Sequence, residues 1–186
     1  MKKSLLLTVI AVLGLANVNA QNVEFGAKAG LNFASIYGDN TSDIGFVTAY
    51  NFGLMSEISI SEKFSFQPEL LYSGIGYSID DESDDDTVAL NYLTVPLLGK
   101  YYLTERFSVE AGPQVGFLLS AKQESTDVKD AFKTLDFGTS LGLGYKLDSG
   151  LNFSARYTLG LSDISESEDF SNNTGVLQLS IGYFFF

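Results

Sequence analysis

After residue 22, bulky apolar side chains alternate with small or polar ones in run after run of the sequence. In the first run, residues 23–34, one face is built from valine, phenylalanine, alanine and leucine, and the other holds mainly glycine and polar residues, including Glu24 and Lys28. A period of two is the signature of a β-strand. A dry core does not accept single charges. The alternation therefore predicts strands with an apolar face toward hydrocarbon and a polar face toward an enclosed interior.

The first twenty residues have the pattern of an export signal. Lys2 and Lys3 precede an apolar stretch over residues 5–15, and Val18-Asn19-Ala20 resembles a small-residue cleavage site. We expect residues 1–20 to be a cleaved signal peptide and residues 21–186 to be one outer-membrane β-barrel domain. No later stretch is continuously apolar for the roughly 20 residues that a membrane helix needs, so strands must do any spanning.

Eight alternating runs follow one another along the chain. They cover residues 23–34, 46–60, 64–73, 88–103, 107–120, 135–145, 151–161 and 177–185. Three short turns alternate with four longer polar connections, an asymmetry typical of outer-membrane barrels, whose periplasmic turns are short and extracellular loops long. The expected fold class is all-β: an eight-stranded antiparallel up-and-down transmembrane β-barrel in the cell outer membrane, with both termini periplasmic.

Charged residues at the inward positions predict an ion-paired interior. Both signs occur at comparable heights above the short turns, and an unpaired ion in a confined interior is costly. We expect a structural network, called here the lumen network, formed by Lys28, Glu57, Glu69, Lys100, Glu110 and Arg156. Because eight strands enclose a space about wide enough for side chains to fill, a plugged lumen is expected. The alternative is a gated path for ions or protons.

The composition excludes several classes of function. A formal charge of −12 argues against nucleic acid as a partner. The chain has no histidine and no cysteine, so serine–histidine acyl transfer lacks its base and thiolate chemistry lacks its nucleophile. We therefore expect a non-enzymatic protein without a cofactor or a resident metal.

Acidic residues are concentrated between alternating runs, where solvated loop tips are expected. One cluster contains Asp80, Asp81, Asp84, Asp85 and Asp86. A weak cation contact through these carboxylates is an alternative to a plain solvated loop. The cluster lacks the ligand spacing and the turn glycine of an EF-hand loop.

Three prolines lie inside the predicted strands. Pro68, Pro96 and Pro113 each remove a donor from a sheet that has no edges. We expect β-bulges at these positions.

Several segments resemble those of a known family. They are residues 66–73, 91–98, 111–116, 155–161 and 181–186. They resemble the PorT-like outer-membrane β-barrel proteins of the Bacteroidetes group, related in architecture to OmpA-type and OmpX-type barrels, over essentially the whole chain after the signal. The resemblance implies a small barrel surrounded by outer-membrane lipid; one branch of the family is tied to type IX secretion. The aromatic end, Tyr183, Phe185 and Phe186, resembles the signal read by the barrel-assembly machinery.

Three functions are consistent with these observations. The leading hypothesis is a non-enzymatic outer-membrane barrel that acts in envelope structure or in surface contact through acidic extracellular loops. The second is an accessory component of transport or protein secretion, with a conducting lumen or a periplasmic partner. The third is a soluble ligand-binding β-barrel, recovered from the aqueous periplasmic fraction.

Overall fold

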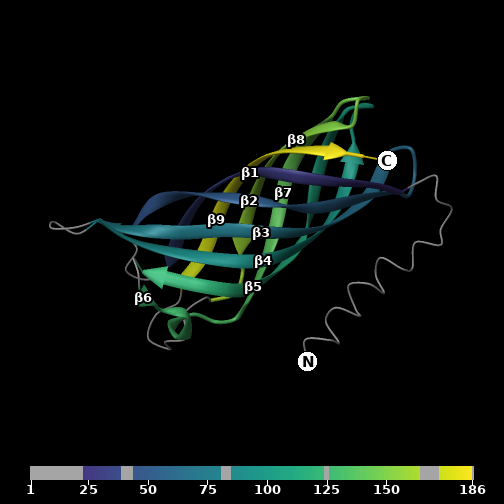
Figure 1. Ribbon diagram of the computed structural model, residues 1–186. Helices are drawn as coiled ribbons and strands as arrows, with labels where there is room; N and C mark the ends of the chain where they lie inside the picture. Colours follow the sequence, from purple (N-terminus) through teal and green to yellow (C-terminus); the bar gives the residue numbers. More distant parts are fainter. Residues whose placement is uncertain (1–22, 39–43, 81–84, 124–125, 164–171, 186) are drawn as a thin grey trace.

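Long antiparallel strands close into a barrel (Figure 1). The computed structural model describes residues 23–38, 44–80, 85–123, 126–163 and 172–185. The long strands in these ranges are β1 Val23–Gly38, β2 Ile44–Ser59, β3 Phe64–Asp80, β4 Asp85–Tyr102, β5 Phe107–Gln123, β7 Leu135–Lys146, β8 Leu151–Gly160 and β9 Asn172–Phe184. Each pairs with the next long strand along the chain, and β1 pairs with β9 to close the ring. The eight-stranded all-β fold predicted from the alternation is confirmed for the described residues.

Two short elements lie in the connection between β5 and β7. The two-residue strand β6, Thr126–Asp127, pairs with the end of β5, and a single 3-10 turn, η1, covers Lys129–Ala131. No helix in the described ranges is long and apolar enough to cross a bilayer.

The two faces of the barrel have the polarity that the alternation predicts. Outward side chains such as Phe46, Tyr50 and Leu141 are 78%, 73% and 67% exposed, whereas inward polar side chains such as Asn32 and Asn51 are 0% and 1% exposed. A soluble barrel that binds a small apolar ligand would reverse this arrangement. The soluble ligand-binding alternative is therefore wrong.

Strand β3 continues to Asp80, seven residues past the end expected from the sequence, and β4 begins at Asp85, three residues before its expected start. They are 17 and 18 residues long, whereas a membrane-crossing strand needs only about 9–11. Their backbones remain paired as far as Asp80 and Asp85, so the supposed long connection after residue 73 is mostly a hairpin. This hairpin projects at the left of Figure 1. We call this end of the barrel the loop end, and the opposite end, with the tight turns before β3, β5 and β8, the short-turn end.

The bulges expected at the prolines are absent from the described strand pairings. Pro68 pairs with Leu97, and the register is the same on both sides of this pair; Pro96 and Pro113 also sit in continuous register. Pairing is interrupted beside the prolines, between Pro68–Leu97 and Leu71–Thr94 and between Pro96–Gln114 and Gly99–Ala111, and it resumes in the same register because no residue is inserted. The register shifts occur elsewhere, between Phe46 and Asn51 and between Asn91 and Tyr92.

The interior of the loop end is apolar, which the prediction of a polar lumen missed. The apolar cluster consists of Ala34, Ile36, Ile75, Val88, Leu90, Tyr92, Leu118, Ala121 and Val176. Val128 and Phe132, from the connection after β5, pack against it. The pairing of β4 with β5 shifts register between Asn91 and Tyr92, opposite Leu119. Leu118 and Ala121 are three residues apart, so strict alternation would put them on opposite faces, but the shift turns both inward.

Candidate functional site

The lumen network gathers side chains from six strands. Lys28 is on β1, Glu57 on β2, Glu69 on β3, Lys100 on β4, Glu110 on β5 and Arg156 on β8. In each strand the period-two pattern directs these side chains inward, and all are at most 4% exposed. They lie between the short-turn end and the apolar cluster.

Arg156 joins two carboxylates at the centre of the lumen network. Its Nη1 and Nη2 donate to the two oxygens of Glu69 at 2.9 Å each, and its Nε donates to Glu110 Oε1 at 2.9 Å. Lys28 Nζ lies 3.3 Å from Glu69 Oε1 and 3.4 Å from the hydroxyl of Ser154. One arginine and one lysine therefore neutralise a shared pair of carboxylates.

A second group of the lumen network lies nearer the short-turn end. Lys100 Nζ donates to Glu57 Oε2 and to Gln67 Oε1, both at 3.0 Å. The amide nitrogen of Gln67 donates in turn to Glu69 Oε1 at 2.6 Å. The neutral Gln67 thus links the two charged groups into one hydrogen-bonded chain.

The lumen network contains three cations and three carboxylates, so its formal charges balance. Burying such groups costs desolvation energy, which mutual pairing and additional hydrogen bonds offset. Because every carboxylate of the lumen network contacts a cation, none is held ready as a catalytic base. The arrangement fills space and joins opposite walls of the barrel.

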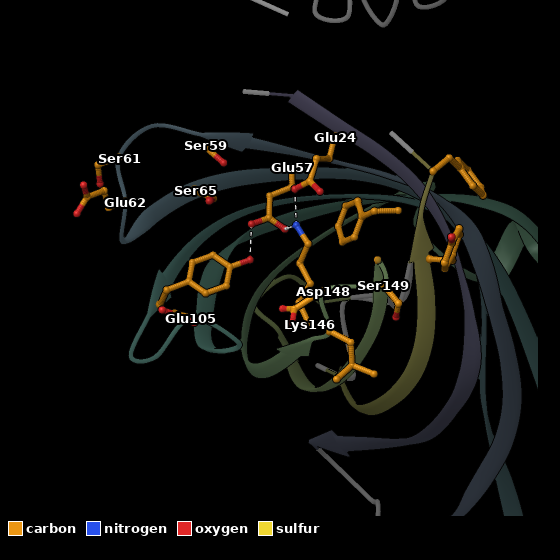
Figure 2. Close-up of a pocket in the computed structure, with 16 residues that line it drawn as sticks. Glu24, Glu57, Ser59, Ser61, Glu62, Ser65, Glu105, Lys146, Asp148 and Ser149 are labelled. Atoms are coloured by element: carbon orange, nitrogen blue, oxygen red, sulfur yellow. Dashed lines mark hydrogen bonds and ion pairs between the residues drawn. The ribbon is translucent and has the colours of Figure 1, made fainter. Parts of the chain in front are cut away.

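A pocket of about 470 Å³ opens at the short-turn end. Figure 2 shows Lys146 reaching between Glu24 and Glu57; it contacts both carboxylates, with Glu57 Oε2 at 3.5 Å. Its Nζ also lies 4.4 Å from the ring centre of Phe184. Tyr102 donates to the other oxygen of Glu57. The sequence pattern did not identify Lys146 or Tyr102 as site residues. Lys146 lies two residues after Gly144, so the same alternation that turns Gly142 and Gly144 inward also turns Lys146 inward.

An exposed ion pair joins two of the short turns. Arg106 Nη2 lies 2.5 Å from Asp148 Oδ2, and its Nε lies 3.3 Å from Oδ1. Hydrogen bonding to the Asp148 carboxylate raises the pKa of Arg106, so the guanidinium remains charged. The sharp turn that carries Asp148 ends at Gly150, whose φ of 88° favours glycine.

An uncharged polar layer lies on the other side of the lumen network. Asn32 receives a hydrogen bond from Asn51 at 2.8 Å and one from Gln178 at 3.2 Å, and it donates to Ser73 at 2.8 Å. Gln178 also accepts from Arg156 at 3.4 Å, which connects this layer to the charges. Alternation within each strand directs these side chains inward, whereas their mutual bonds depend on how the strands are aligned around the barrel.

The remaining sequence-predicted residues lie apart from the lumen network. Tyr183 and Phe185 point outward, with ring centres 5.9 Å apart, while Phe186 lies outside the described residues. Of the possible cation ligands, Asp81 and Asp84 lie outside the described residues. For Asp80, Asp85 and Asp86 only the backbone is described.

Comparison with known proteins identifies relatives by sequence and by fold. A sequence model of the outer membrane protein beta-barrel domain matches residues 19–166. Ail, the attachment invasion locus protein of Yersinia pestis, solved with the heparin analogue sucrose octasulfate, is 15% identical at a TM-score of 0.55, covering 89% of this chain and 100% of its own. Neisserial surface protein A is 13% identical at a TM-score of 0.59, with 87% and 97% covered. No curated protein matches the chain. At these identities the solved structures establish similarity of fold.

Proposed function

This chain belongs to the outer membrane protein beta-barrel domain family, and from that premise we propose that it is a non-enzymatic barrel with a plugged lumen that acts in envelope structure or surface contact. The observation that supports this proposal is that side chains fill the interior of the barrel. Arg156, Glu69 and Glu110 occupy its centre at 1–3% exposure, and the apolar cluster occupies its loop end. Because the lumen is filled, the function resides in the surfaces of the barrel outside the membrane.

We assign the loop end to the cell exterior and both termini to the periplasm. The asymmetry of the connections supports this orientation, because outer-membrane barrels keep their short turns in the periplasm. Residues 1–20 are then removed after export, and the outward apolar side chains contact outer-membrane lipid. The barrel-assembly machinery reads the aromatic end formed by Tyr183, Phe185 and Phe186.

The extracellular surface offered to a partner is acidic. The hairpin of β3 and β4 carries residues 80–86, six of which are aspartate or glutamate. The Ail structure holds a sulfated heparin analogue. Like charges repel, so this hairpin disfavours sulfated sugars and favours cationic or neutral partners.

A binding experiment tests the surface-contact proposal. The mature barrel in lipid nanodiscs is expected to bind a polylysine-coated surface more strongly than a heparin-coated one at low salt. Replacing Asp84, Asp85 and Asp86 with asparagine should weaken that binding. The matched control replaces Glu62 and Glu105, acids of the short-turn end, with glutamine. Equal losses in both variants would refute a role for the hairpin.

A PorT-like accessory role in secretion or transport is the second candidate. The pocket at the short-turn end favours it, because side chains of several turns and strands converge there on a surface that faces the periplasm in the proposed orientation. Copurification from outer membranes in mild detergent distinguishes the candidates. A stoichiometric partner lost on substitution of Glu62 and Glu105 supports the accessory role, whereas a barrel recovered alone supports the envelope role.

A further inference from the structure

A small internal cavity lies between the polar layer and the apolar cluster. Its volume is about 20 Å³. The polar part of its lining comes from six strands and includes Ser73, Thr94, Gln114, Asp136, Thr158 and Thr174. Unlike the pocket at the short-turn end, this space lies where polar and apolar parts of the interior meet.

One polar group that lines the cavity lacks a protein partner. Tyr92 is 2% exposed, and its hydroxyl is one of two buried side-chain polar atoms in the described part of the chain without a hydrogen bond. The rest of the Tyr92 side chain packs within the apolar cluster. A buried hydroxyl without a partner destabilises the folded state, and such groups in native proteins are commonly satisfied by internal water.

We propose that this cavity is a binding site for one ordered water molecule. A space of about 20 Å³ exceeds the roughly 10–15 Å³ that a single water requires, and a buried water needs about two to four polar partners. Tyr92 donates to this water. The water donates in turn to Asp136. This inward carboxylate accepts from Ser162 at 2.7 Å and is also hydrogen-bonded to Thr174 and to the backbone of Phe137, and the roughly four acceptor sites of a carboxylate leave room for one more donor.

Water fits the site better than a metal cation does. A hard cation requires about six oxygen ligands around it. Two of the lining side chains are already engaged, since Thr158 is bonded to Ser140 at 2.8 Å and Gln178 donates to Asn32 at 3.2 Å. The bound water joins β4 to β7, the two strands that flank β5 in the barrel wall. It does not complete a proton path, because Arg156 has no acceptor with which to relay a proton.

The test uses nuclear magnetic resonance of the whole mature barrel in nanodiscs. Cross-relaxation between water and the methyl protons of Thr94 and Thr174 is expected, with none at the methyl groups of Leu90, which lies in the apolar cluster. A signal at the threonines alone supports the site. No signal at the threonines, or an equal signal at Leu90, overturns it.

A stability measurement provides an independent test. Tyr92→Phe removes the hydroxyl, and loss of a water-mediated bond is expected to raise the unfolding equilibrium constant roughly 2- to 10-fold. Tyr50→Phe, on the exposed outer face, is the matched control and should change it little. If the cavity is dry, Tyr92→Phe leaves the constant unchanged or lowers it, and the proposal fails. Should Tyr92→Phe not assemble, the resonance experiment on the unaltered barrel decides alone.

Discussion

Arg156 on β8 donates hydrogen bonds from both terminal nitrogens to Glu69 on β3, although three other strands separate β8 from β3 around the ring. This paired geometry is among the stronger polar contacts in proteins, because two parallel charge-assisted bonds hold both planar groups. It places a crosslink through the middle of the lumen. The barrel is therefore closed by its strand pairing and also held together across its interior.

Removing Arg156 should destabilise the barrel strongly. Arg156→Met leaves Lys28 as the only cation in contact with Glu69 and leaves Glu110 without its cation, and breaking a buried pair in this way costs about 3–5 kcal/mol. Reversible urea unfolding in lipid vesicles measures the change. Arg106→Met is the control, because its pair with Asp148 is exposed and should contribute little.

A graded variant sharpens this test. Arg156→Lys keeps the positive charge but cannot make the two-pronged contact, so its stability should fall between those of Arg156→Met and the unaltered protein. Equal stability of Arg156→Met and Arg106→Met would contradict a buried crosslink.

The apolar cluster should behave as a true core. Leu90 is 0% exposed, so Leu90→Ala leaves an internal cavity and is expected to cost about 2–5 kcal/mol. Leu141→Ala, on the outer face at 67% exposure, should cost much less because lipid fills the space. Unfolding of both variants in the same vesicles provides the comparison. A larger loss of stability for Leu141→Ala than for Leu90→Ala would contradict an apolar core inside the loop end.

The filled lumen should not conduct ions. In planar bilayers the refolded barrel is expected to give no steady, large conductance, because both the lumen network and the apolar cluster lie across the path. Detergent without protein serves as the blank. Steady, large channels from a monodisperse preparation would refute the plug and favour the gated-path alternative.

The aromatic end should be needed for assembly. Deleting Phe185 and Phe186 is expected to leave the protein in the periplasm or degraded, since the final strand then lacks the proposed recognition signal. Replacing both residues with tyrosine keeps the aromatic character and should preserve assembly. Outer-membrane yield and heat-modifiable gel mobility give the readout, and a normal yield from the deletion would argue against the signal.

Local periodicity was sufficient to predict the strands and their two faces. A side chain two positions along a strand returns to the same face whatever its neighbours are, so Lys28 and Arg156 are recognisable as inward from their own segments. The prediction of inward and outward faces fails where a register shift interrupts the alternation, as at the shift that turns both Leu118 and Ala121 inward.

The partners of those inward side chains could not be read in the same way. Whether Arg156 meets Glu69, Glu57 or Asp136 depends on the stagger and tilt of all the strands around the ring, which no single strand encodes. The same holds for the apolar cluster, which five strands assemble from residues that separately resemble ordinary strand ends. Short-range alternation thus specifies which way each side chain points, and closure of the whole barrel selects what it touches.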